Sequence, residues 1–155
     1  MKWLFLLVSH LAVGVLGVGL GIYLLPILTQ PDSPDMAKIE RLSQDARYTG
    51  QFDRARKDSD FLHWGEGEIK ITNTDVVFQG KLAPGPDYKL YLSPIFVESE
   101  ADFATYQSSM VQIGDVKTFG GFVLDLPPGT DLTAYDTVVV WCESFGEFIT
   151  AAKYR

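Results

Sequence analysis

The chain has 155 residues, of which 13 are Lys or Arg and 20 are Asp or Glu, so its formal net charge is −7 at pH 7. An acidic chain without a basic cluster argues against nucleic acid as a partner, because that binding depends on Lys and Arg that neutralise phosphates. The sequence also lacks a polybasic patch for anionic lipid.

The first element is an apolar run over residues 3–28 that contains no Asp, Glu, Lys or Arg. As a helix it would be about 39 Å long, more than the ~30 Å hydrocarbon core of a bilayer. A cleaved signal peptide is the alternative, but its apolar region usually spans only about 7 to 15 residues and ends in small residues. Here the run continues into LLPILTQPDS. The pattern predicts an uncleaved transmembrane signal anchor over residues 1–30.

The orientation of this anchor does not follow from counting charges. Lys2 and the terminal amine lie on one side, and Lys38, Arg41 and Arg47 follow on the other. The residues nearest the exit, TQPDSPD, are acidic or neutral, and Lys2 directly precedes the apolar run, as in an export signal. We therefore expect a single-pass protein of the bacterial cytoplasmic membrane with an extracytoplasmic globular part, periplasmic or at the cell surface.

Two polar or small features lie inside the predicted span. Gly17 and Gly21 form a G-x-x-x-G pattern, through which two helices can approach closely, so a weak homodimer is expected on this face. His10 is an ionisable residue within the span, and we interpret it as a neutral imidazole that faces a neighbouring helix.

Residues 31–47 are polar and begin with two prolines. Met36, Ile39 and Leu42 have helical spacing, with Ser33 or Asp35 as the N-cap. We predict a stalk with one short helix. The alternative is an amphipathic helix that binds a partner.

Residues 48–155 form the predicted globular domain, in which apolar residues alternate with period two between turn signals rich in Pro, Gly and Asp. The predicted fold class is all-β, an antiparallel β-sandwich of about seven to eight strands that follows the transmembrane helix and the stalk. The expected strands are residues 63–72, 75–82, 88–93, 110–117, 120–126, 136–143 and 147–154, with one helix over 101–109.

The strand over residues 136–143 differs from the others because it is apolar on both faces. Val138, Val140 and Cys142 share one face, while Val139 and Trp141 lie on the other. This pattern predicts a central strand, followed by a C-terminal hairpin.

Most catalytic chemistry is excluded by the scarcity of suitable residues. Cys142 is the single cysteine, and His63 is the only histidine outside the predicted span. No G-x-S-x-G or similar nucleophile motif is present, and one cysteine with one histidine cannot fill a structural zinc shell. The glycine pairs do not open helices after parallel strands, so a phosphate-binding loop is not indicated.

Four segments carry a resemblance to a known family. They are TGQFDRARKDSDFLHWGEGEIKI, GPDYKLYLSP, IGDVKTFGGFVLDLP and DLTAYDTVVVWCESFGEFITAAKY. Together they resemble the DM-thirteen domain, a proposed electron-transfer domain mentioned beside the haem- and sugar-binding DOMON sandwiches. The last segment is the most specific, because the family has its characteristic cysteine after an apolar strand and a Trp.

The resemblance implies a redox or electron-transfer role centred on Cys142, as a bare thiol or as a ligand to a prosthetic group such as haem. A lone thiol cannot form an internal disulfide, so redox work requires a partner protein, a small thiol or a cofactor. His63 is a second candidate haem ligand, and covalent attachment is not indicated because C-x-x-C-H is absent. No metal site is expected, and the chain is expected to be an electron-transfer component and not a self-sufficient enzyme.

The alternative function is a non-catalytic β-sandwich module that binds a protein or a glycan. In that interpretation Cys142 is structural, because free cysteine is among the most buried residue types and packs as a small hydrophobe. A reactive thiol needs exposure or a lowered pKa, and we expect the neighbouring Glu143 to raise the pKa of Cys142.

Overall fold

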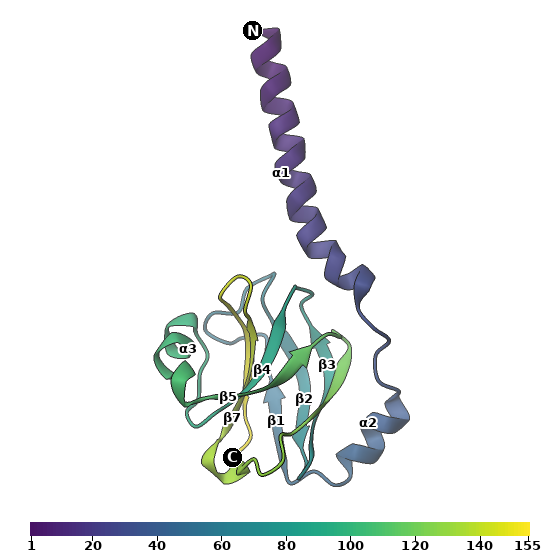
Figure 1. The fold of residues 1–155 in the computed structure, drawn as a ribbon, viewed down its shortest axis with the longest axis vertical. Helices are drawn as coiled ribbons and strands as arrows, with labels where there is room; N and C mark the ends of the chain where they lie inside the picture. Colours follow the sequence, from purple (N-terminus) through teal and green to yellow (C-terminus); the bar gives the residue numbers. More distant parts are fainter.

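The computed structural model describes all 155 residues (Figure 1). The helices are α1 (Lys2–Thr29), α2 (Met36–Ser43) and α3 (Glu100–Tyr106), and short 3-10 turns follow α3 and precede β7. The strands are β1 (Tyr48–Phe52), β2 (Gly65–Ile71), β3 (Asp75–Leu82), β4 (Tyr88–Ser93), β5 (Val111–Val116), β6 (Gly121–Asp125), β7 (Thr137–Cys142) and β8 (Glu147–Lys153).

The strands form two antiparallel sheets with the orders β1-β2-β3-β6 and β5-β4-β7-β8. The sheets pack face to face as a β-sandwich, and β1 also lies near β8 and β5 near β6, which covers the sheet edges. The predicted sandwich is confirmed, although three helices mean that the chain is not strictly all-β. One strand was not predicted: β1 pairs with β2 from Tyr48 opposite Ile71 to Phe52 opposite Gly67.

The core between the sheets contains the side chains that the alternation placed inward. Ile69 and Ile71 of β2, Leu90 and Leu92 of β4 and Phe122 of β6 belong to a single buried cluster. Each strand thus gives one apolar face to the same interior, as expected for a sandwich in which both sheets bury one side.

The strand that is apolar on both faces, β7, is central as predicted, because β4 and β8 flank it and all six of its residues are buried. The helix predicted over 101–109 is also confirmed as α3 and its 3-10 extension, and it covers the outer face of β7. There Phe103 stacks on Trp141, with ring centroids 3.9 Å apart and planes 4° apart. The second apolar face of β7 is therefore buried against α3.

The segment predicted as a polar stalk contains the predicted short helix, α2. Asp35 caps α2 as predicted, since its side chain accepts a hydrogen bond from the Ala37 backbone N–H at 3.1 Å. However, α2 packs against β3, and Ile39 is 1% exposed. The connecting segment therefore lies against the first sheet through this helix.

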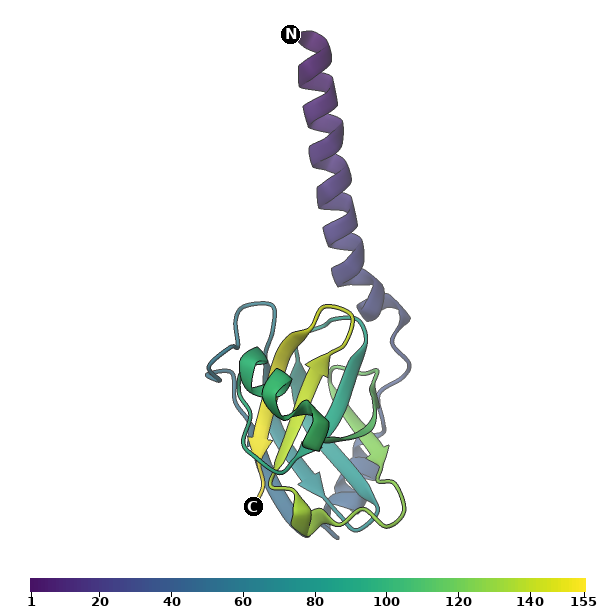
Figure 2. The ribbon, with the colours of Figure 1, turned by 60° about the vertical axis from the view of Figure 1, so that its left-hand side comes forward.

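The first helix, α1, projects away from one end of the sandwich (Figures 1 and 2). It is long and apolar enough to cross a membrane, and none of its most apolar 18 residues is buried inside the protein. A signal sequence has the same properties. Gly17 and Gly21 have no other part of the chain within 4 Å of where a Cβ would lie, so their face is free of the domain. Dimerisation through it stays a prediction.

Candidate functional site

Cys142 is the last residue of β7, at the end of the sandwich from which α1 projects. Its side chain is 3% exposed and points into the layer between the sheets, with Val138 and Val140. The thiol donates a hydrogen bond to the carbonyl oxygen of Pro86, with Sγ 3.1 Å from that oxygen. Across the strand pair, Tyr88 of β4 lies directly opposite Cys142.

The surroundings of the thiol favour its neutral form. Burial raises the pKa of Cys142 above its ordinary value, and the charges of Asp87 and Glu147 act in the same direction. Backbone N–H groups of Phe145 and Ser144 oppose this rise without cancelling it. The direction agrees with our expectation from the sequence, but burial and not Glu143 is the cause.

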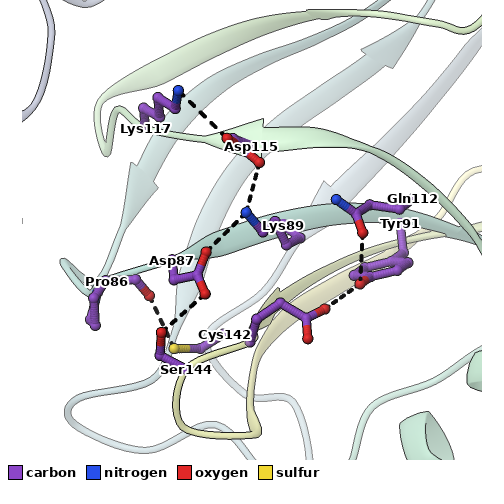
Figure 3. Close-up of polar contacts among 10 residues, drawn as sticks. Pro86, Asp87, Lys89, Tyr91, Gln112, Asp115, Lys117, Cys142 and Ser144 are labelled. Carbon is purple, nitrogen blue, oxygen red and sulfur yellow. Dashed lines mark hydrogen bonds and ion pairs between the residues drawn. The ribbon is translucent and has the colours of Figure 1, made fainter.

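A chain of charged side chains holds the β3–β4 loop against the β7–β8 turn (Figure 3). Lys89 Nζ lies 2.9 Å from Asp87 Oδ1 and 2.7 Å from Asp115 Oδ1, and Lys117 lies 3.5 Å from the other oxygen of Asp115. The Ser144 hydroxyl donates to Asp87 Oδ2 at 3.0 Å. These contacts connect the loop that carries Pro86 to the turn after Cys142.

Asp87 has an unusual backbone conformation within this loop. Its φ is 55°, the only positive φ outside glycine. Its carbonyl oxygen accepts a hydrogen bond from the Glu143 N–H at 3.1 Å, and the hydrogen bonds from Lys89 and then from Ser144 lower the pKa of its carboxyl. A residue in the left-handed region persists where surrounding contacts hold it. Asp87 therefore fixes the position of the carbonyl that the thiol contacts.

His63 lies in the loop before β2, at the same end of the sandwich. Its Nδ1 is 3.1 Å from Asp60 Oδ2, and Asp60 also accepts hydrogen bonds from the backbone N–H groups of Leu62 and His63. Burial acts to raise the pKa of Asp60, but these hydrogen bonds outweigh it and leave that pKa below its ordinary value. An ionised Asp60 that accepts from Nδ1–H leaves Nε2 as the proton acceptor of the ring.

Cys142 and His63 line one cavity of about 660 Å³. On the domain side, the other lining residues are Leu62, Pro84, Gly85, Pro86, Tyr88 and Phe145, and on the other side the wall is α1 between Val15 and Tyr23. The lining is mostly apolar and contains no Asp, Glu, Lys or Arg. The structure thus brings together the two residues that the sequence singled out.

A prosthetic group in this cavity would have to suit its lining. No group of three His, Cys, Asp or Glu side chains could hold a metal ion. Haem could take a thiolate and an imidazole as axial ligands. However, burial raises the pKa of the Cys142 thiol, which donates to the Pro86 carbonyl, and no Lys or Arg lines the cavity to pair with haem carboxylates. The lining does not fit haem.

Sequence reasoning missed the roles of three residues that complete the site: Tyr88, Gly85 and Asp87. Tyr88 alternates with polar residues as a core residue does, so nothing in the sequence distinguished it from Leu90 and Leu92. In the structure, burial raises the pKa of Tyr88, and the charge of Cys142 is the second cause of that rise. Gly85 leaves room for the Tyr88 ring, since a Cβ on Gly85 would collide with it. Asp87 could have been noticed as the last residue of the turn signal PGPD.

The fold and the site define a class: an antiparallel sandwich with one buried thiol at the edge of an apolar cavity. A sequence model of the family described as "Electron transfer DM13" matches residues 55–154. The chain belongs to this DM13 electron-transfer family, and the matched region contains β2 to β8, Cys142 and His63. Comparison with curated proteins and with solved structures gives no match.

Proposed function

We propose that the protein is a membrane-anchored component of electron transfer in which the Cys142 thiol is the reactive group. The observation that carries this proposal is that the single thiol of the chain lines a cavity of about 660 Å³ together with His63. Membership of the DM13 family supports a redox role, and the length and apolar surface of α1 support the anchor.

The chemistry that suits one thiol is exchange with a disulfide of a partner protein. The Cys142 thiolate attacks one sulfur of the partner's disulfide, a mixed disulfide forms, and the partner's second sulfur leaves as a thiolate. The thiol proton must first be removed, and His63 Nε2 is the acceptor on the same cavity. The partner supplies the oxidising equivalents, so the domain is a carrier and not an enzyme on its own.

The proposed organisation has three parts: a transmembrane anchor over residues 1–30, a connecting segment over 31–47 and the domain over 48–155. Lys2 before the apolar run and the acidic residues after it favour an extracytoplasmic domain on a bacterial cytoplasmic membrane. A dimer through Gly17 and Gly21 is compatible with this arrangement, because both residues lie on the helix face opposite the cavity.

A second function is favoured by a specific observation. Cys142 is 3% exposed, its thiol is bonded to Pro86, and burial raises its pKa, all of which suit a structural cysteine in a non-catalytic module that binds a protein or a glycan. The two functions differ in whether the thiol reacts in the folded protein.

Alkylation of the full chain in detergent separates them. We expect a maleimide to modify folded Cys142, with a rate that rises with pH later than for the unfolded chain, because burial raises the pKa of the folded thiol. Cys142→Ser provides the blank, and His63→Ala should slow the reaction near neutral pH. Mass spectrometry after timed quenching measures the rates. Resistance until the protein unfolds would favour the structural cysteine.

A further inference from the structure

Three exposed apolar side chains lie at the end of the sandwich that faces α1: Phe61, Leu62 and Phe145. After α1, five large hydrophobic residues are exposed: Met36, Phe61, Leu62, Ile95 and Phe145. Leu62 and Phe145 line the cavity beside Cys142, and Phe61 is adjacent to Leu62. Phe61 is 85% exposed and Phe145 is 54% exposed. Two exposed aromatic side chains on loops beside an apolar helix indicate an interaction surface.

The α1 residues that form the opposite wall indicate the environment into which the cavity opens. The α1 residues on the cavity lie between Val15 and Tyr23, inside the charge-free run of residues 3–28. If α1 spans a membrane, a core of ~30 Å takes about 20 residues of helix, so residues 15–22 lie in hydrocarbon wherever that core begins within the run. A cavity with such a wall cannot open into water along that side.

The domain surface that faces α1 changes from charged to apolar in the same order as the layers of a bilayer. Nearer the end of the helix, a second cavity of about 330 Å³ lies between Leu25–Pro31 and the domain. Its domain wall carries Asp87, Lys89, Asp115 and Lys117, which pair with one another. The change from paired charges to an uncharged lining takes place within a few turns of the helix. Headgroups followed by acyl chains impose the same order.

We propose that this end of the domain docks on the membrane that α1 anchors, with Phe61, Leu62 and Phe145 inserted among the lipids. The cavity beside Cys142 then opens into the bilayer, so a partner's disulfide that reaches the thiol by this route must lie on a segment that is itself embedded in lipid. The charges near the end are paired, so a zwitterionic surface is sufficient and salt should have little effect. The proposal rests on the membrane anchor of the proposed function.

The test uses the full chain reconstituted into phosphatidylcholine vesicles. In a Cys142→Ala background, Phe145→Cys and Ala134→Cys each carry an environment-sensitive fluorophore. Ala134 is exposed and precedes β7, whereas Phe145 follows it, so the two reporters lie at opposite ends of a strand about 20 Å long. Lipids with a nitroxide on the acyl chain should quench the reporter at 145 and leave the one at 134 nearly unchanged.

The outcomes separate the anchor from the docking. A chain that fails to float with the vesicles contradicts the anchor in the proposed function, and the docking with it. A chain that floats while both reporters are quenched equally keeps the anchor and overturns the docking. Quenching confined to position 145 supports the docking.

A second measurement avoids any substitution at the thiol. In the unmodified chain, transfer from denaturing detergent to vesicles slows both reagents, because folding buries the thiol and raises its pKa. It should slow a charged, lipid-insoluble maleimide about tenfold more than an uncharged, lipid-soluble one, since moving charge into lipid is costly. Equal slowing of both reagents would contradict an opening into the bilayer.

Discussion

The two faces of β7 place neighbouring residues in different surroundings. Trp141 points outward into a small cluster with Phe103, Tyr91 and Phe148, which α3 closes. Cys142 points inward, to the point where the sandwich core meets a cavity. The first side chain has aromatic rings against it, and the second has the Pro86 carbonyl on one side and a hollow on another.

Fractional exposure does not distinguish these positions, since Trp141 is 8% exposed and Cys142 is 3% exposed. The difference lies in what adjoins each side chain. A buried group without a neighbouring space can only pack, whereas a buried group beside a cavity can meet a molecule that enters it. Low exposure of the thiol is therefore compatible with a reactive role.

The largest expected change in stability concerns the outer face of β7, which α3 covers. Phe103→Ala removes the ring that stacks on Trp141 and should reduce the free energy of unfolding by about 3 to 5 kcal/mol, as for other buried Phe-to-Ala substitutions. Denaturant unfolding of the full chain in detergent measures it. Thr105→Ala on the exposed side of α3 is the control, with an expected change within about 0.5 kcal/mol. Equal effects would mean that α3 does not close this face.

A smaller effect is expected on the cavity side. Cys142→Ala removes one sulfur that already borders a hollow, so the loss should be about 1 kcal/mol. Val140→Ala, on the same face but 0% exposed within the core, should cost more, about 2 kcal/mol, because the void there is closed on all sides. Unfolding curves for the pair provide the comparison. A larger loss for Cys142→Ala would show that the thiol is a packing residue of the core.

Much of the fold followed from period-two patterning, because each strand of a sandwich buries one face and period two shows in a single sequence. The seven predicted strands and the helix over 101–109 correspond to β2 to β8 and α3. β1 was missed because YTGQF contains Gly50 and two polar residues, and its partner β2 lies 12 residues further along. Pairing with a strand that far along the chain produces no recognisable pattern in the sequence of β1 itself.

The site was predictable only in part. Cys142 and His63 stood out because they are rare in this chain. The cavity that joins them is built by four segments far apart in sequence, namely α1, the loop at 61–63, the β3–β4 loop and the β7–β8 turn. Tyr88 and Asp87 have their roles because these four segments lie together in the folded chain. No local sequence pattern encodes that arrangement, so the sequence predicted the two rare residues but not the cavity between them.

The layer between the sheets is expected to be dry away from the cavity. Thr150 of β8 lies opposite Val140, and its Cγ2 is the nearest atom to the position of a Cβ on Gly65 in the other sheet. Its buried Oγ1 has no hydrogen-bond partner. Thr150→Val keeps the shape and removes the unpaired hydroxyl, so in a dry layer the free energy of unfolding should rise by up to about 1 kcal/mol.

Thr137→Val is the matched control for this substitution. Thr137 is also 0% exposed, but its hydroxyl donates to Asp136 Oδ1 at 2.6 Å. Losing that bond should lower the free energy of unfolding by about 1 kcal/mol, so the two variants are expected to change stability in opposite directions. Loss of stability in both would mean that the Thr150 hydroxyl is hydrated. Water would then extend from the cavity past Val140, and the contrast between an open strand end and a closed core would fail.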